Sequence, residues 1–302
     1  MTLLTESEIT SGWESEKPLV SICCITYKQV EYIEQTLNSL LAQKTTFPFE
    51  VIVSDDCSHD GSEQVLARYA ESYPAIVKVI SSSHNLGGNR NLWKTLNAAK
   101  GKYISCCEGD DYWCDVNKLQ RQVDFLDANP DYSVHIYDCY EEVNAKVTEA
   151  SSKLTRLGIR TGDYTSADLK QEFCMILVTA CFKNINEFEY PRYFDKSISG
   201  DTLLNLMLSD HGKAHVDSSR KVAVYRIFDG GIWSKMSQDK KYYESMHTNL
   251  VHSLYLFNNS QKECSDLKLC SILFNTLKRV GIFYFVKYAT LRVLKRLINK
   301  KF

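Results

Sequence analysis

The sequence lacks the features that would assign it to a specialised class of protein. No apolar run approaches the about 20 residues that span a bilayer, and residues 1–17 are polar and acidic rather than signal-like. The 11 cysteines form no CxxC pair and no Cys/His array with zinc spacing. With a net charge of −1, the chain has no overall positive charge that would attract nucleic acid. These absences predict a cytoplasmic protein with reduced cysteines that binds no nucleic acid.

Two common nucleotide-binding signatures are also missing. The chain contains neither GxxxxGKS nor GxxxxGKT, which excludes a P-loop, and the Gly-rich segment NLGGNRN at 85–91 lacks GxGxxG. With 44% hydrophobic and 24% charged residues, the composition is that of an ordinary globular protein. At 302 residues the chain is long enough for one large domain or two unequal ones.

The first half of the chain alternates apolar runs with amphipathic segments. Continuous apolar runs of strand length lie at 19–26, 49–54, 75–82, 102–107 and 132–138. Segments with helical spacing lie between them, at 31–43, from Asp60 onward, at 91–100 and at 116–128. The alternation predicts an α/β fold with a mostly parallel sheet and helices on both faces. In such sheets ligands bind beyond the carboxyl ends of the strands.

The second half of the chain is less regular. Residues 140–175 are polar and mixed, and predict a variable excursion. An apolar stretch at 175–182, a helix at 202–210 and a strand at 221–227 are expected to form a second subregion packed on the first. Residues 238–302 predict helices alone.

Acidic residues gather where two of the predicted strands end. The first acidic group is Asp55 and Asp56, and the second acidic group is Glu108, Asp110 and Asp111. Carboxylates at such positions often cap helices, and Asp60 is interpreted as a cap because Asp60 and Glu63 have capping-box spacing. Adjacent carboxylates raise one another's pKa unless a cation or hydrogen bonds compensate. Since oxygen ligands select Mg²⁺ or Mn²⁺, a divalent metal that carries a diphosphate is the prediction for this edge of the sheet.

Five segments occur in the order and spacing of the family-2 glycosyltransferases, which the chain resembles. They are PLVSICCITYKQVEYIEQTLNSLLAQ, FEVIVSDDCSHDGSEQVL, NLGGNRN, GKYISCCEGDDYW and SGDTLLNLML…VAVYRIFDGGIWS. The resemblance is strong over residues 18–130 and moderate over 175–235. It implies the GT-A fold, a Rossmann-like α/β sheet, and transfer of a sugar from a nucleotide donor with inversion at the anomeric carbon.

The resemblance also implies a division of the chain into three parts. Residues 1–17 would be a polar N-terminal tail, residues 18–235 the glycosyltransferase domain, and residues 236–302 a C-terminal helical region. Within the domain, residues 18–138 would form the nucleotide-binding half and residues 139–235 the acceptor half.

Four residues would bind the nucleotide if the family pattern is carried over position by position. Thr26 and Tyr27 would line the base pocket, and Asp56 would accept a hydrogen bond from the imide N–H of the base, uracil being the usual case. Arg90, in the Gly-rich segment, would reach the base or a phosphate.

The same carry-over places a metal, Mn²⁺ or Mg²⁺, on the second acidic group. Asp111 would hold the metal, and Asp110 would contact the ribose or share the metal. Two positions depart from the family pattern. Glu108 stands where many relatives have Asp, and Phe228 stands where relatives often have a metal- or diphosphate-binding His. Whether Glu108 or the nearby Asp229 contacts the ligand stays open.

The resemblance implies that Asp201, in SGDTLLNLML, is the general base that takes the proton of the acceptor hydroxyl. The structural alternative for Asp201 is a helix N-cap. Asp195 and Asp210 are the fallback bases. Trp113 and Trp233 are interpreted either as platforms for sugar faces or as core residues.

Residues 276–302 contain many aliphatic, aromatic and basic residues and no acidic residue, as in helices that lie on anionic membranes. The alternative is a C-terminal helix packed on the domain.

The expected function is transfer of a hexose or N-acetylhexosamine from a UDP-sugar to a saccharide acceptor linked to a polyprenyl diphosphate. That reaction belongs to surface polysaccharide synthesis, such as O-antigen or capsule, on the cytoplasmic face of the inner membrane. The alternatives are a non-catalytic sugar-nucleotide-binding protein and a sugar nucleotidyltransferase.

Overall fold

The computed structural model describes residues 3–148, 152–171, 173, 175–185, 188–189, 199–228, 231 and 235–280. The chain divides between Met236 and Ser237 into two compact units.

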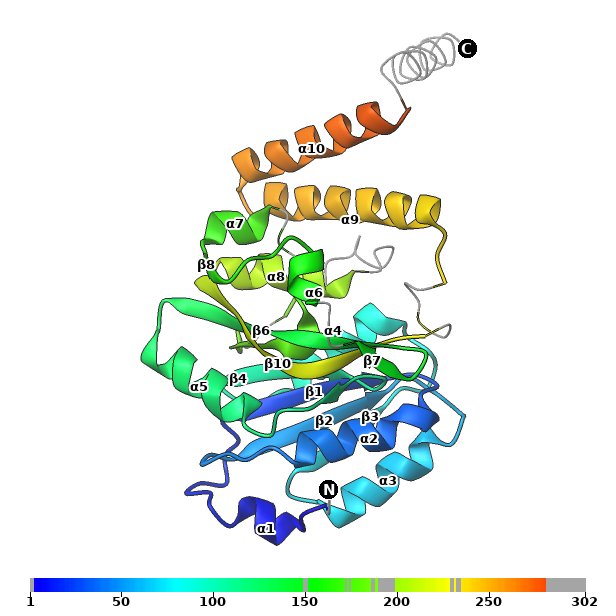
Figure 1. The fold of residues 1–302 in the computed structure, drawn as a ribbon, viewed down its shortest axis with the longest axis vertical. Coiled ribbons are helices and arrows are strands. Elements are labelled where there is room, and N and C mark those ends of the chain that lie inside the picture. The colour runs from blue at the N-terminus through cyan, green and yellow to red at the C-terminus, as the bar shows by residue number, and fades with distance from the viewer. Residues whose placement is uncertain are drawn as a thin grey trace. The chain divides into compact units, whose positions relative to one another are not determined.

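One sheet forms the centre of the first unit, and ten strands belong to it in the described part of the chain (Figure 1). The strands are β1 (Val20–Thr26), β2 (Phe49–Asp55), β3 (Val77–Ser81), β4 (Tyr103–Glu108), β5 (Tyr112–Trp113), β6 (Tyr132–Val143), β7 (Lys146–Thr148), β8 (Gly162–Tyr164), β9 (Ala180–Lys183) and β10 (Lys213–Ile227). Their order is β3-β2-β1-β4-β9-β6-β10-β5, with β7 paired to β6 and β8 paired to β10. Strands β1 to β4 are parallel to one another, as are β6 and β10, whereas β9 runs antiparallel to both β4 and β6.

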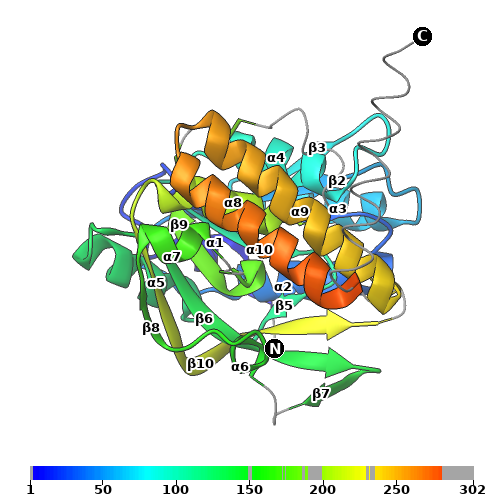
Figure 2. The same cartoon turned by 90° about the horizontal axis from the view of Figure 1, so that it is seen from above.

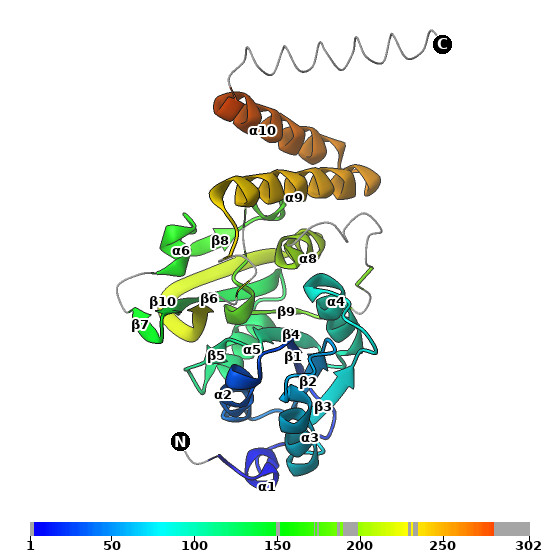
Figure 3. The ribbon, with the colours of Figure 1, turned by 90° about the vertical axis from the view of Figure 1, so that its right-hand side faces the viewer.

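Helices cover both faces of this sheet, with α2 on one side and α4 on the other (Figure 3). The longer helices are α2 (Val30–Leu41), α3 (Ser62–Ser72), α4 (Gly88–Ala98), α5 (Lys118–Ala128) and α8 (Gly200–Ser209). The spacing predicted for α2 is confirmed, because Ile33, Leu37, Leu40 and Leu41 form its buried side. The predicted α/β architecture with helices on both faces is confirmed, and the sheet is mixed: its pairings are parallel from β3 to β4 and between β6 and β10, and antiparallel elsewhere.

Short or polar elements escaped the sequence analysis. Helices α6 (Lys153–Arg156) and α7 (Ser166–Lys170) lie in the excursion that follows β6, and β10 is longer than the strand expected at 221–227. Residues in the segment expected as a tail form helix α1 (Glu6–Thr10), which begins with a capping box between Thr5 and Glu8. The next residues pack on the body of the domain, because the ring of Trp13 lies 5.3 Å from that of Phe49.

The second unit contains the helices α9 (Gln238–Asn258) and α10 (Lys262–Val280), which lie side by side (Figure 2). The hydroxyl of Ser265 donates to the carbonyl of Ser253, 2.9 Å away, and Val251 and Leu256 are buried. Large apolar side chains of this unit are exposed: Tyr243, Leu250, Leu254, Phe257, Leu267, Leu269, Leu273 and Phe274. No helix in the described ranges has the length and apolar character required to cross a membrane.

Candidate functional site

A tight turn at the carboxyl end of β4 carries the second acidic group. The amide of Gly109 donates to the carbonyl of Ile25 at 2.9 Å, and the amide of Asp111 donates to the carbonyl of Glu108 at 3.0 Å. A Cβ atom at position 109 would lie 2.8 Å from Oγ1 of Thr26, so the turn approaches β1 more closely than any residue but glycine allows. The turn therefore fixes the three carboxylates beside the end of β1.

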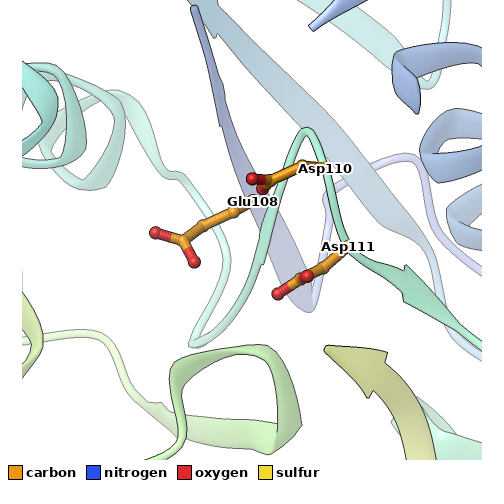
Figure 4. Close-up of side chains that lie close together, drawn as sticks. All are labelled: Glu108, Asp110 and Asp111. Atoms are coloured by element: carbon orange, nitrogen blue, oxygen red, sulfur yellow. The ribbon is translucent and has the colours of Figure 1, made fainter. Parts of the chain in front are cut away.

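The carboxylates of Glu108, Asp110 and Asp111 converge (Figure 4). Each offers an oxygen, and these three oxygens lie within 4.8 Å of one another. One oxygen of Glu108, whose role the sequence left ambiguous, therefore lies close to an oxygen of each aspartate. We call these three residues the acidic cluster.

Burial and mutual repulsion make the charged form of the acidic cluster costly. Burial raises the pKa of Glu108 to about 7, and the negative charges of Asp110 and Asp201 contribute to the rise. Burial likewise raises the pKa of Asp111, with Asp110 and Glu108 adding repulsion. Burial also raises the pKa of Asp110, against the positive charge of Arg226. The cluster thus has negative charge that the protein compensates only in part.

Asp111 has one oxygen that the protein uses and one that it leaves without a partner. Oδ1 accepts a hydrogen bond from the amide of Arg226 at 2.8 Å. Oδ2 is buried and has no hydrogen-bond partner among the described residues. A buried carboxylate oxygen without a partner is unfavourable, and a divalent cation would satisfy it. Three converging oxygen donors suit Mn²⁺ or Mg²⁺, so these residues fit the metal that the sequence led us to expect.

Arg226 supports the turn, and the sequence analysis did not identify it. Its guanidinium donates to the carbonyl of Asp110 at 2.6 Å and to Oε1 of Glu142 at 3.1 Å, and it also bonds to Gln35. It lies 4.6 Å from the centre of the Tyr112 ring. The available signal was an arginine within the apolar run at 221–227, since a buried arginine requires polar partners.

Asp201 lies in the first turn of α8, about ninety residues along the chain from the acidic cluster, and its charge reaches that cluster. Its Oδ1 accepts from the amide of Thr202 at 2.8 Å, and the N-cap position belongs to Ser199, so Asp201 is not the N-cap. Burial raises the pKa of Asp201, and its negative charge in turn contributes to the raised pKa of Glu108. The fold thus brings the predicted base within electrostatic reach of the predicted metal ligands.

The fallback bases differ in position. Asp210 is at the opposite end of α8, where it forms an ion pair with Lys170 at 2.7 Å. Asp195 lies outside the described residues.

Three of the four predicted nucleotide-binding residues lie at or just beyond the carboxyl ends of β1 and β2, and the fourth, Arg90, follows β3. Thr26 ends β1 and is buried, Tyr27 is exposed, and Arg90 is exposed in the first turn of α4. The carboxylate of Asp56 accepts from the amides of Leu86 at 2.8 Å and Gly87 at 2.9 Å. A carboxylate has about four acceptor positions, so these bonds leave capacity for a base N–H. The contacts of these residues with a nucleotide stay predictions.

Asp55 and Asp60, the other aspartates that follow or end β2, accept hydrogen bonds from the local chain. Asp55 accepts from the amide of Ser58 at 3.2 Å and from its hydroxyl. Asp60 accepts from the amides of Ser62 at 3.0 Å and Val30 at 3.1 Å, which are the first residues of α3 and α2. The N-cap of α3 is Gly61, so the predicted N-cap at Asp60 is wrong, and Glu63 bonds to the amide of His59 instead of closing a capping box.

Trp113 belongs to the core. Its indole N–H donates to the carbonyl of Val178 at 2.9 Å, and the buried ammonium of Lys118 lies 4.0 Å from its ring centre. Phe228, at the position where relatives often have histidine, packs against the ring of Tyr32 at 5.1 Å. Asp229 and Trp233 lie outside the described residues.

Comparisons with known proteins agree with this geometry. Residues 21–182 match the family described as glycosyl transferase family 2. An uncharacterized protein of Mycobacterium tuberculosis is 31% identical over 245 residues, which are 78% of this chain and 66% of that protein. The chain thus matches slightly less than two thirds of that relative's length. TuaG of Bacillus subtilis, whose name describes a glycosyltransferase of teichuronic acid biosynthesis, is 36% identical over 110 residues, 36% of this chain and 42% of that protein.

A solved structure shares the fold. TarS residues 1–349 of S. aureus, in complex with UDP-GlcNAc, gives a TM-score of 0.61 at 21% identity and covers 86% of this chain and 72% of that chain. The family match spans more than half of the chain, and the resemblance in the sequence is confirmed. The chain belongs to glycosyl transferase family 2 and has the GT-A fold.

Proposed function

We propose that the protein is an inverting glycosyltransferase that moves a hexose or N-acetylhexosamine from a UDP-sugar to a saccharide acceptor. One observation carries the proposal: the charge of Asp201 reaches a cluster of three carboxylates in which a buried oxygen of Asp111 has no partner in the described part of the chain. A metal-diphosphate site and a carboxylate base are the two parts that a single-displacement glycosyl transfer requires.

Asp201 would take the proton from the acceptor hydroxyl as its oxygen bonds to the anomeric carbon. The bond from that carbon to the diphosphate breaks at the same time, on the opposite side, so the configuration inverts. A raised pKa makes Asp201 a stronger base, while its ionised form is the one that accepts the proton. When bound by Asp111 and Asp110, with Glu108 beside them, Mn²⁺ or Mg²⁺ would neutralise charge on the diphosphate.

The nucleotide would lie across the ends of β1 and β2. Thr26 and Tyr27 would contact the base, Asp56 would accept from its imide N–H, and Arg90 would reach the base or a phosphate. The use of UDP is supported by Asp56, because an ionised carboxylate only accepts hydrogen bonds and the imide N–H of uracil donates one.

The acceptor would be a saccharide on a polyprenyl diphosphate, used in surface polysaccharide synthesis at the cytoplasmic face of the inner membrane. The name of TuaG supports the polysaccharide, and exposed apolar side chains such as Leu250, Phe257 and Phe274 support contact with a membrane. The basic segment 276–302 would add electrostatic attraction to anionic lipids.

A screen of nucleotide-sugars tests the reaction. Incubation with Mn²⁺ should hydrolyse a UDP-sugar in preference to its GDP and dTDP counterparts, with release of UDP measured by chromatography. With an acceptor present, NMR of the product should show an inverted anomeric centre. A retained configuration, or release of pyrophosphate from a nucleoside triphosphate, would overturn the proposal.

Charge reversal tests the membrane contact. Replacing four basic residues with glutamate should weaken binding to phosphatidylglycerol vesicles at least about 10-fold. Each basic residue near an anionic surface contributes about 1 kcal/mol to binding. The positions are Lys287, Arg292, Lys295 and Arg296. Cosedimentation with these vesicles, and with neutral phosphatidylcholine vesicles as the control, measures the effect. Equal binding of wild type and variant to the anionic vesicles would show that the segment does not contact the membrane.

A further inference from the structure

Lys153 begins the short helix α6, in the excursion that follows β6. Its side chain is half-buried, and its Nζ lies 2.9 Å from the centre of the Tyr225 ring. Within the part of the chain that the structure describes, the ammonium makes no hydrogen bond or ion pair. A half-buried lysine that rests on an aromatic ring has donors to spare.

The strands that frame the acidic cluster also fix the position of Lys153. The amide of Leu154 donates to Oδ1 of Asp138 at 3.2 Å, and Leu154 is buried. The guanidinium of Arg156 bonds to Glu141. Asp138 and Glu141 both belong to β6, so α6 is attached to that strand by polar contacts at two points.

Tyr225 connects Lys153 to the acidic cluster. It lies on β10, opposite Glu141 of β6 in the strand register. The next residue is Arg226, whose amide donates to Asp111. The negative charges of the acidic cluster raise the pKa of the Tyr225 hydroxyl further than burial alone does. The ring under Lys153 is therefore within electrostatic reach of the three carboxylates.

The charge of Lys153 acts on the same carboxylates. Burial raises the pKa of Glu108, Asp111 and Asp201, and the positive charge of Lys153 opposes the rise at all three. The other cation close by, Arg226, already has its guanidinium bonded to Asp110, Glu142 and Gln35. Lys153 is thus a cation near the acidic cluster whose N–H donors remain available to a ligand.

We propose that Lys153 binds the diphosphate of the nucleotide-sugar donor, beside the metal held by Asp110 and Asp111. A lysine that served only to neutralise the carboxylates would form an ion pair with one of them, whereas this ammonium rests on a ring. A flexible four-carbon stem lets it turn to a phosphate oxygen, and lysine binds phosphate as a point charge. The inference rests on the proposed function, because it takes a nucleotide diphosphate as the ligand.

Binding of UDP and of uridine, each measured by calorimetry in the presence of Mn²⁺, tests this role. Lys153→Met retains an aliphatic chain over Tyr225 and removes the charge, so UDP affinity should fall about 10- to 100-fold. Uridine affinity should not change, because uridine has no phosphate. Lys153→Arg should bind UDP more tightly than Lys153→Met does. The matched control is Lys146→Met, at an exposed position of β7 in the same excursion, and it should bind UDP as the wild type does.

Three results would overturn the inference. Wild-type affinity of Lys153→Met for UDP would show that the lysine does not contact the diphosphate, and would leave the proposed function standing. Equal losses for UDP and uridine would show that Lys153 only supports the fold. A wild-type protein that binds neither UDP nor uridine would overturn the proposed function and this inference with it.

Discussion

Replacing Asp111 with asparagine should abolish Mn²⁺-dependent binding of UDP and leave the protein folded. The substitution retains the shape of the side chain and an oxygen to accept from the amide of Arg226, which now bonds to Oδ1 at 2.8 Å. It removes the charge of the buried group whose second oxygen has no partner. Because a metal ion contributes several kcal/mol of charge stabilisation, donor turnover should fall at least about 100-fold.

Thermal unfolding separates loss of the metal from loss of the fold. Without metal, Asp111→Asn should unfold at or above the wild-type temperature, since one of three mutually repelling buried carboxylates is gone. Excess Mn²⁺ should raise the melting temperature of the wild type and leave that of the variant unchanged. Asp127→Asn is the matched control, because Asp127 pairs with Lys102 and Tyr103 at the other end of β4. Full activity of wild-type enzyme in excess chelator would refute the metal site.

The apolar patterns of the chain determine its elements, and the sequence predicted these well. Continuous burial along β1 and β2 leaves no solvent-facing side, which is why both strands read as unbroken apolar runs. The pairing of later strands was beyond prediction. The short strand β9 enters the sheet antiparallel, between β4 and β6, and its direction depends on where the chain returns from, which no local pattern encodes.

The residues around the site divide in a similar way. Glu108, Asp110 and Asp111 could be found because they are adjacent in sequence and follow a strand. Arg226 left only an indirect signal, an arginine within an apolar run, and Lys153 left none, because both are placed by tertiary contacts. Lys153 in particular lies in a polar segment without periodicity, and the bond from its neighbour Leu154 to β6 holds it in place.

Replacing Asp201 with asparagine should leave UDP binding intact and reduce transfer. A positioned general base contributes about 100- to 10,000-fold to a rate, so kcat should fall by a factor in that range. The amide oxygen of asparagine can still accept from the amide of Thr202, which now bonds to Asp201 at 2.8 Å, so α8 should retain its start. Asp201 is not one of the three residues whose oxygens converge, so Asp201→Asn should retain Mn²⁺-dependent binding of UDP.

The pH profile gives this prediction a second readout. The base must be ionised, and burial raises the pKa of Asp201, so wild-type kcat should increase with pH across that raised pKa and then level off. The residual kcat of Asp201→Asn should not show this increase with pH. Asp210→Asn is the matched control, since Asp210 is at the other end of α8 and pairs with Lys170. If Asp210→Asn lost transfer and Asp201→Asn retained it, the base would be assigned to the wrong end of the helix. Because the charge of Asp201 reaches Glu108, a base at Asp201 would place proton removal and the departure of the diphosphate within one electrostatic environment.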